Sequence, residues 1–432
     1  MSEPGLVELL QELIRFDTTN PPGNETGCVR HIQQTLEAAG IETHLAGSSP
    51  ERQNLVARLP GRGEAPPLLL QGHVDVVPTA NQVWSQRPFE GVLVGGEVWG
   101  RGTIDMKGGV SMMVTALLRG ARTGGYPGDV VLAVVADEEA GGIHGAGWLV
   151  GNRPELFAGI RHALGEGGGF ALRLGGRRFY PLMVAEKRGI PIRVTFHGGG
   201  GHASIPFRDG AMAKLGRALE ALNSRRLQVH HTPATRLMLE SFRDALDGPE
   251  RADFEGLLDP DQADHVLDRL GPAGRRWDAL LHNSFNPTLV QGGIKLNVIP
   301  SAVTLDLDCR VLPGVSAEDL VGELTQLLGP DAELEVVRQS PRMPEPQLGG
   351  YFETLREIVR ERDPGAVPVP FVTTGGTDAR HFAQLGIQTY GFLLYNQEGI
   401  EERMHDADER ASVESLEFGL AALEEAIRRY RG

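Results

Sequence analysis

Cysteine is scarce in this chain of 432 residues, which contains only Cys28 and Cys309. Two cysteines do not make the disulfide framework of a small secreted protein, and they fit a reducing compartment, so we expect a cytoplasmic location. Long apolar runs are also missing, since no stretch approaches the roughly 18 uncharged residues of a membrane span. The first residues, MSEPGLVELLQELIRF, carry charges through their apolar pattern and lack the core of a signal peptide.

Basic residues are also few compared with acidic ones. Lys and Arg total 42 against 57 Asp and Glu, which gives a formal net charge of −15. Nucleic acids and anionic membranes bind basic surfaces, so neither is an expected partner. Glycine, by contrast, is abundant at 57 residues, as in proteins with many tight turns and loop-rich sites. A chain of this length exceeds one ordinary core, and we expect two domains.

The order of predicted elements indicates that one domain is inserted into another. Strands alternate with helices in residues 1–186 and again in 343–432, which predicts an α/β domain with a sheet covered on both faces. Residues 187–342 instead read β-α-β-β-α-β, the split βαβ order of ferredoxin-like domains. The predicted elements are the strands 191–198, 285–300, 302–314 and 332–339 and the helices 211–224 and 316–328. A further segment at about 226–285 reads as helical, and we expect it to elaborate the small domain.

Acidic and histidine side chains gather where predicted strands end. QGHVDVVP carries His73 and Asp75, and VVADEEAGG carries Glu138 and Glu139. Three more stretches, GRGTIDMKGG, LGEGGG and RMHDADE, supply Asp105, Glu166 and His405. Taken singly, each reads best as a solvated loop residue. Together, two histidines and several carboxylates flanked by glycine fit a site for two divalent ions at the strand ends of an α/β sheet.

These motifs carry a resemblance to a known family. GHVDVVP, GRGTIDMKGG, DEEAGG, GEGGG, GHASIP, KLNVIPS, CRVLPG and GGTDAR resemble, in sequence and in order, the motifs of the M20 metallopeptidases and amidohydrolases. The family includes aminoacylases, acetylornithine deacetylase, succinyl-diaminopimelate desuccinylase and carboxypeptidase S, and the chain looks most like the carboxypeptidase S branch. The resemblance implies a zinc-exopeptidase-like α/β catalytic domain with an inserted ferredoxin-like α+β domain that serves as dimerisation domain or lid.

The resemblance also implies a role for each residue of the cluster. Asp105 is expected to bridge two Zn²⁺ ions, for which Co²⁺ or Mn²⁺ are possible substitutes. His73 and Glu166 would complete one ion, and Glu139 and His405 the other. Asp75 is expected to orient His73, and Glu138 to act as general base toward a metal-activated water. Family members also tend to hold the peptide bond after the bridging aspartate in the cis form, here Asp105–Met106.

Four residues outside the metal cluster are further candidates. His202 in GHASIP would reach into the site of a partner subunit and stabilise the oxyanion, unless it is simply a loop histidine. Asn297 in KLNVIPS would anchor the same intermediate, or is a turn residue before a proline. Arg310 and Arg380 are candidates for binding a substrate carboxylate, because the guanidinium fork suits it; the alternative for each is an ordinary ion pair.

The function implied is hydrolysis of an amide bond by a metal-dependent enzyme. The substrate would be an N-acyl amino acid or the C-terminal residue of a short peptide, and a homodimer through the inserted domain is expected. A dipeptidase, or a deacetylase or desuccinylase of an amino-acid biosynthesis intermediate, is the alternative. A non-enzymatic metal-binding protein on the same fold is disfavoured, because every expected ligand position and the general base are filled.

Overall fold

The computed structural model describes residues 4–340 and 345–432. A nine-stranded mixed sheet forms the large domain, in the order β1-β2-β6-β3-β7-β18-β9-β17, with β8 paired to β9. Its strands are β1 (Glu42–Gly47), β2 (Gln53–Leu59), β3 (Leu68–His73), β6 (Val130–Val135), β7 (His162–Gly165), β8 (Leu172–Leu174), β9 (Arg177–Glu186), β17 (Val367–Thr373) and β18 (Gln388–Gly391). Strands β6, β3, β7 and β18 run parallel to one another, so their carboxyl ends meet at one edge.

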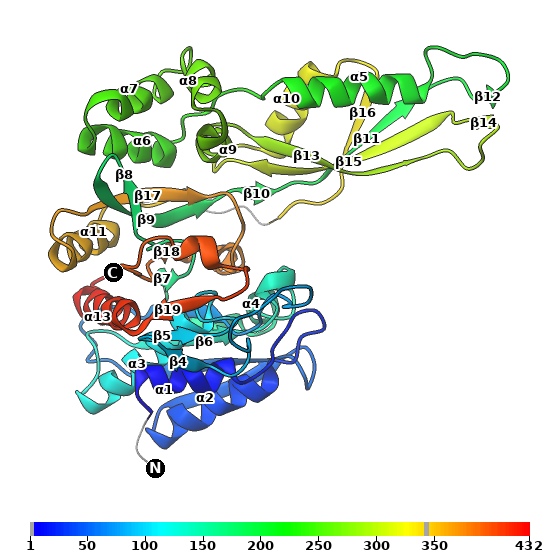
Figure 1. The fold of residues 1–432 in the computed structure, drawn as a ribbon. Coiled ribbons are helices and arrows are strands. Elements are labelled where there is room, and N and C mark those ends of the chain that lie inside the picture. Colours follow the sequence, from blue (N-terminus) through cyan, green and yellow to red (C-terminus); the bar gives the residue numbers. More distant parts are fainter. Residues whose placement is uncertain (1–3, 341–344) are drawn as a thin grey trace.

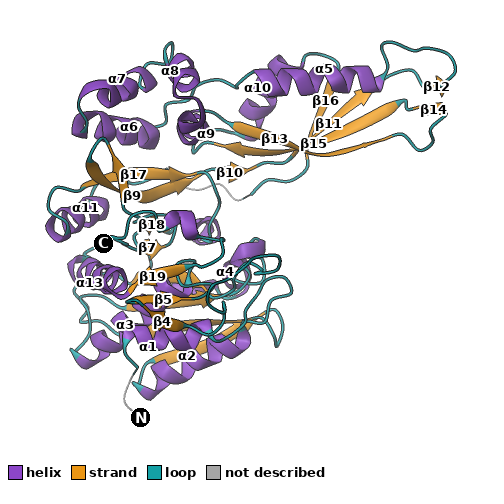
Figure 2. Cartoon of the chain, viewed as in Figure 1, coloured by secondary structure: helices purple, strands orange, loops and turns teal. Residues whose placement is uncertain are grey.

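Helices cover both faces of this sheet, as the continuous apolar run of β6 requires. Leu132 and Val134 of β6 point into the core beneath the long helices, whereas Val131 and Ala133 pack on the opposite face. Figure 2 shows the labelled helices around the strands. One face is covered by α1 (Leu6–Ile14), α2 (Thr26–Ala38), α3 (Lys107–Arg122), α11 (Tyr351–Arg362) and α13 (Val413–Arg429). The other face is covered by α4 (Ala146–Asn152), η2 (Pro154–Phe157), α12 (Ala379–Phe382) and η4 (Ala383–Leu385). A small sheet of β4 (Val92–Val94), β5 (Glu97–Trp99) and β19 (Arg410–Ser412) completes the domain.

The small domain has the predicted split βαβ order. Strands β10 (Arg188–Gly189), β11 (Ile192–His197), β13 (Ser284–Gly292), β15 (Ala302–Val311) and β16 (Ala332–Val336) form a five-stranded antiparallel sheet. Helices α5 (Ala211–Ser224) and α10 (Ala317–Leu328) pack on it, and together they bury a separate core. Figure 1 shows this domain as an arm that extends from the large domain, with β12 (Gly201–His202) and β14 (Val298–Ile299) paired at its far end.

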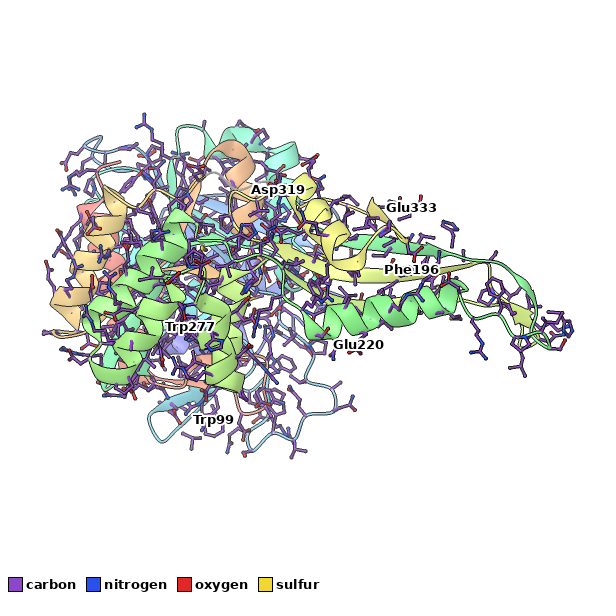
Figure 3. The ribbon with its side chains drawn as sticks, turned by 90° about the horizontal axis from the view of Figure 1, so that it is seen from above. Trp99, Phe196, Glu220, Trp277, Asp319 and Glu333 are labelled. Atoms are coloured by element: carbon purple, nitrogen blue, oxygen red, sulfur yellow. The ribbon has the colours of Figure 1, made fainter. Side chains whose placement is uncertain are left out.

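The helical segment between α5 and β13 packs differently from the expectation that it would elaborate the small domain. It forms α6 (Pro233–Ala245), α7 (Gly248–Leu257), α8 (Ala263–Leu270), η3 (Gly271–Gly274) and α9 (Arg275–Leu281). Met238 and Phe242 of α6 are buried in the core of the large domain, where Phe242 lies 4.6 Å from Phe179 of β9 between ring centroids. Trp277 of α9 packs on Phe242 as well, and Figure 3 shows it on the large-domain side of the arm. The segment therefore caps the exposed end of the large sheet, next to β17.

The first predicted domain division lies between β9, which ends at Glu186 in the large sheet, and β10, which begins at Arg188 in the small one. The second, between residues 342 and 343, falls outside the described residues. No helix within residues 4–340 or 345–432 combines the length and apolar character needed to cross a membrane.

Candidate metal centre

Three neighbouring parallel strands bring four of the candidate side chains to one edge of the large sheet. His73 is the last residue of β3, and Glu166 directly follows β7. Glu138 and Glu139 follow β6 in a single 3₁₀ turn, η1 (Glu138–Ala140). Because β3 lies between β6 and β7, these side chains converge. Ligand sites in α/β sheets are usually built at such carboxyl ends.

Asp105 lies between the two histidines. Its Oδ1 is 3.0 Å from Nε2 of His73, and its Oδ2 is 3.0 Å from Nε2 of His405. Asp105 comes from the loop before α3, and His405 from the loop after η5 (Glu401–Arg403), so distant parts of the chain meet here. The Asp105–Met106 peptide bond is cis, as the resemblance implied.

A glutamate stands beside each histidine. Oε2 of Glu166 lies 3.7 Å from Nε2 of His73, and Oε1 of Glu139 lies 3.4 Å from Nε2 of His405. Oε1 of Glu139 is buried and has no hydrogen-bond partner among the described residues. Each histidine thus has Asp105 and one glutamate beside it: Glu166 at His73 and Glu139 at His405. The ligand atoms that all lie within 4.8 Å of one another form two groups, one of His73, Asp105 and Glu139 and the other of His73, Glu138 and Glu166. Imidazole nitrogens and carboxylate oxygens at these spacings fit two borderline-hard divalent cations.

The cluster holds more carboxylates than basic groups, so positive charge stabilises it. Burial alone would raise the pKa of Asp105, but His405 and His73 outweigh burial and hold that pKa below its usual range. Hydrogen bonds to Asp105 and Glu139 raise the pKa of His405 to about 10. For Glu138, burial raises the pKa well above its usual value, and repulsion from Glu166 adds to the effect. Protonated imidazoles therefore stabilise the packed carboxylates here, a role that cations can take over.

Asp75 links the histidine to the two neighbouring glutamates. Its Oδ1 lies 3.4 Å from Nδ1 of His73 and accepts the backbone N–H of Glu138 at 3.1 Å. Its Oδ2 accepts the backbone N–H of Glu139 at 3.1 Å and the side-chain amide of Asn20 at 2.8 Å. The buried Asp75 carboxylate thus fixes the turn that carries both acids as well as facing the ring of His73.

The candidate ligands other than the buried His73 line a cavity of about 620 Å³. Arg310 of β15 and Arg380 of α12, both predicted from the sequence, also line it. Arg310 makes a bidentate ion pair with Asp308, at 2.8 and 3.0 Å, whereas Arg380 has no hydrogen-bonded or ion-paired partner among the described residues. Apolar side chains complete the wall: Ile104, Met106, Phe170, Phe371, Leu393, Tyr395 and Met404.

His202 and Asn297 do not lie at this cavity. His202 ends β12 at the far end of the arm, and Asn297 immediately precedes β14 there (Figure 1). Both are exposed, and Nδ1 of His202 contacts the hydroxyl of Ser204 at 2.8 Å. Within one subunit, these two side chains are remote from the candidate metal ligands.

Comparison with known proteins identifies the chain. The family model described as peptidase family M20/M25/M40 matches residues 69–429. The chain belongs to the M20 peptidase family. It is similar to probable carboxypeptidase S-like 2 of Dictyostelium discoideum, with 26% identity over 81% of this chain and 69% of that protein. It is also similar to human aminoacylase-1, with 25% identity over 94% of this chain and 90% of that protein.

Solved structures of M20 peptidases share the fold. The M20 metallo-carboxypeptidase Sso-CP2 of Sulfolobus solfataricus superposes with a TM-score of 0.69 at 16% identity, and the match covers all of both chains. A dinuclear metal-binding M20 peptidase of Bacillus subtilis, YXEP, matches with a TM-score of 0.61 at 14% identity over 98% of this chain and 96% of that one. The expected α/β fold with an inserted α+β domain is confirmed, and the chain is a metallohydrolase of the M20 type.

Two buried acids beside the site of this M20 chain were not assigned a role from the sequence. Glu409 accepts the backbone N–H groups of Ile104 at 2.7 Å and of Asp105 at 3.2 Å, and so fixes the loop that presents the Asp105 carboxylate. Neither carboxyl oxygen of Asp378 has a hydrogen-bond partner among the described residues, and burial raises its pKa to about 8. Both lie in the quoted stretches RMHDADE and GGTDAR, but sequence alone does not show that they are buried.

Proposed function

We propose that this M20 hydrolase uses two zinc ions to cleave the amide bond of an N-acyl amino acid or the C-terminal peptide bond of a short peptide. The observation that carries the proposal is the position of Asp105, with one carboxylate oxygen 3.0 Å from His73 and the other 3.0 Å from His405. A carboxylate in this position could be a ligand to two cations at once. His73 and Glu166 would hold one ion, and His405 and Glu139 the other, with Co²⁺ or Mn²⁺ as possible substitutes.

When bound, a pair of divalent ions lowers the pKa of water and stabilises the negative charge that develops on the amide oxygen. Glu138 is the proposed general base. Its carboxyl lines the cavity, its backbone is held by Asp75, and its raised pKa suits a group that takes a proton and then passes it to the leaving amine. Nδ1 of His73 lies 3.0 Å from the backbone carbonyl oxygen of Asp75 and 3.4 Å from its carboxylate, so Asp75 would orient the ring and leave Nε2 free to bind metal.

The proposed carboxylate-binding residues are Arg380 and Arg310. Arg380 lines the cavity and makes no hydrogen bond or ion pair among the described residues, so its guanidinium donors remain available to an anion. The buried acids Asp378 and Glu186 lie close enough for Arg380 to lower the pKa of each. Arg310 donates through Nε and Nη2 to Asp308, which fixes the orientation of the guanidinium and leaves Nη1 available to the substrate. A free carboxylate on the substrate would thereby be anchored next to the scissile amide.

His202 and Asn297 would act across a homodimer. Both are exposed at the far end of the arm, so they would reach an active site only in another subunit, where His202 would stabilise the oxyanion. The arm also carries exposed apolar side chains that a dimer interface would cover: Ile205, Phe207, Met212, Leu289, Val290, Ile294 and Leu296. Because Cys28 and Cys309 are buried and unpaired, we also propose that the enzyme works in the cytoplasm.

The test is a panel of N-acyl amino acids and dipeptides, each with a free and with an amidated carboxyl group, assayed with the zinc-loaded protein. We expect hydrolysis of the free acids and loss of at least about tenfold in kcat/KM on amidation, because an ion pair with arginine is lost. Faster turnover of acyl amino acids indicates a deacylase, and faster turnover of dipeptides indicates a dipeptidase or carboxypeptidase. Equal rates for free and amidated substrates would contradict the role of the arginines, and no turnover of any member would contradict the proposed function.

A further inference from the structure

A third arginine lines the cavity, and it comes from the helical segment rather than from a family motif. Arg276 lies in the first turn of α9 and faces the same cavity as Asp105 and His405. Its Nη2 lies 3.2 Å from both Oε1 and Oε2 of Glu401, a residue of η5 four positions before His405. The helical segment therefore contributes charge directly to the active-site opening.

The pairing between Arg276 and Glu401 is loose. A single nitrogen serves both oxygens at 3.2 Å, whereas charge-assisted hydrogen bonds are usually about 2.7–2.9 Å long. Arg310, by comparison, uses two nitrogens on two oxygens of Asp308. The Nε and Nη1 donors of Arg276 have no other partner among the described residues, and both side chains of the pair are 45% exposed. Arg276 can therefore accept a second carboxylate without first breaking a strong ion pair.

Arg276 is also set apart from the other two arginines of the cavity. Arg310 and Arg380 share a small side pocket with Glu186, and Arg276 does not line that pocket. Arg276 instead contacts the loop that carries His405. A substrate whose α-carboxylate lies at Arg380 would thus have its scissile amide at the metal ligands and its remaining portion free to extend toward Arg276.

We propose that Arg276 binds a second carboxylate of the substrate, so that the enzyme prefers amides whose acyl group itself ends in a carboxylate. This inference rests on the proposed amide hydrolysis. Glu401 pairs loosely with the guanidinium in the absence of substrate and competes with the acyl carboxylate for it when substrate binds. Arg276 thereby sets acyl specificity, and the helical segment, which supplies Arg276, becomes part of the substrate site.

The test compares kcat/KM for an N-succinyl and an N-acetyl derivative of the same amino acid. We expect the wild-type protein to favour the succinyl substrate by at least about tenfold, as a charged hydrogen bond would give. Arg276→Gln should bring the ratio of the two values close to one, and Arg276→Lys should retain part of it. Glu401→Gln should raise the ratio, because the competing carboxylate is gone. Arg275→Gln, at the exposed neighbouring arginine outside the cavity lining, is the matched control and should leave the ratio as it is.

The opposite directions expected for Arg276→Gln and Glu401→Gln separate substrate binding from a structural role. If the pair only joined α9 to the loop, both variants would change the ratio in the same way, and this result would overturn the inference. An unchanged ratio in Arg276→Gln would do the same.

A binding measurement keeps the inference testable if the wild-type protein hydrolyses neither substrate, an outcome that contradicts the proposed function alone. Calorimetry on zinc-loaded Glu138→Gln protein should then show the N-succinyl amino acid binding at least about tenfold more tightly than after the additional change Arg276→Gln. Equal affinities would overturn the role of Arg276.

Discussion

His405 Nε2 lies 3.0 Å from Oδ2 of Asp105, although 300 residues separate the two in the sequence. The contact joins the loop after β5 to the loop before β19. It places the imidazole of His405 next to Oδ2 of Asp105, while His73 lies next to Oδ1. Asp105 and Glu139 together raise the pKa of His405 to about 10, so the imidazole is protonated at neutral pH in the metal-free protein.

Zinc binding should therefore release protons. A metal-bound imidazole must be neutral at the ligating nitrogen, so the cation displaces the proton from His405. At pH 7 we expect the release of at least about one proton per protein on zinc loading, and an apparent zinc affinity that rises with pH up to about pH 10. Calorimetric titration of the apoprotein in two buffers with different ionisation enthalpies measures the number. His44→Ala serves as control because its exposed imidazole lies on β1 and contacts Glu42 rather than a proposed ligand. A release of zero protons in the wild type would contradict the assignment of His405 as a ligand.

The adjacent acids Glu138 and Glu139 should respond differently when each is changed to glutamine, one in turnover alone and the other also in metal content. Glu138→Gln removes the proposed base but none of the proposed ligands, so we expect both metal ions to remain and kcat to fall by about 10²–10⁴-fold. Glu139→Gln removes a ligand oxygen that is buried beside His405, so we expect one metal ion to be lost along with activity. Elemental analysis and turnover of the same preparations measure both effects. Metal loss from Glu138→Gln, or full metal content in Glu139→Gln, would reverse the two assignments.

Much of this fold follows from local sequence pattern. The run VVLAVV predicts a buried strand, and the structure places β6 between two layers of helices. The β-α-β-β-α-β order of the small domain was predicted in the same way, because each of its elements keeps a clear periodicity. The metal cluster was predicted from histidine and acidic residues that follow strands, and the parallel pairing of β6, β3 and β7 explains why they meet.

Other features depend on tertiary contacts that no local pattern encodes. Strand β17 contains Pro368 and Pro370, which weaken its strand pattern, but it lies at the end of the sheet where proline is tolerated. The sequence also did not predict which domain the helical segment packs against. The pattern of an amphipathic helix such as α6 shows that one face is buried but not which domain covers that face. For the same reason Arg276, which belongs to no motif, could not be recognised as a cavity residue before its helix was placed.

Lys187, between the two sheets, should make stability depend on pH. Its ammonium is buried and donates to the carbonyl oxygens of Ala279 and His282 and to the hydroxyl of Ser284, all within 2.9 Å. Burial lowers the pKa of Lys187 to about 7, below that of a lysine in the unfolded chain. Between pH 7 and about 10 the unfolded chain therefore binds more protons than the folded one, and raising the pH favours the folded state.

The measurement is denaturant unfolding of the wild type and of Lys187→Met across this pH range. The free energy of unfolding of the wild type should rise relative to the variant by up to about 1.4 kcal/mol per pH unit. Lys295→Met, at an exposed lysine near the end of the arm, should show no such relative slope. A constant difference between wild type and Lys187→Met would mean that Lys187 keeps its ordinary pKa in the folded protein.

The remote position of His202 leads to a prediction about mixed dimers. If each active site needs His202 from the other subunit, His202→Ala and Glu138→Gln are both nearly inactive as homodimers, because every site lacks one of the two groups. In a mixed dimer, the subunit with His202→Ala keeps its own Glu138 and receives His202 from the Glu138→Gln subunit, so one of its two sites is complete. Random exchange at equal concentrations should thus restore about a quarter of wild-type activity, since half of the dimers are mixed and each has one complete site of two.

Subunit exchange is verified by co-purification of differently tagged chains. Mixing Glu138→Gln with tagged Glu138→Gln is the control that should stay inactive. If verified mixed dimers show no activity above the two homodimers, His202 does not act in the partner's site, and its place at the end of the arm would serve the interface alone.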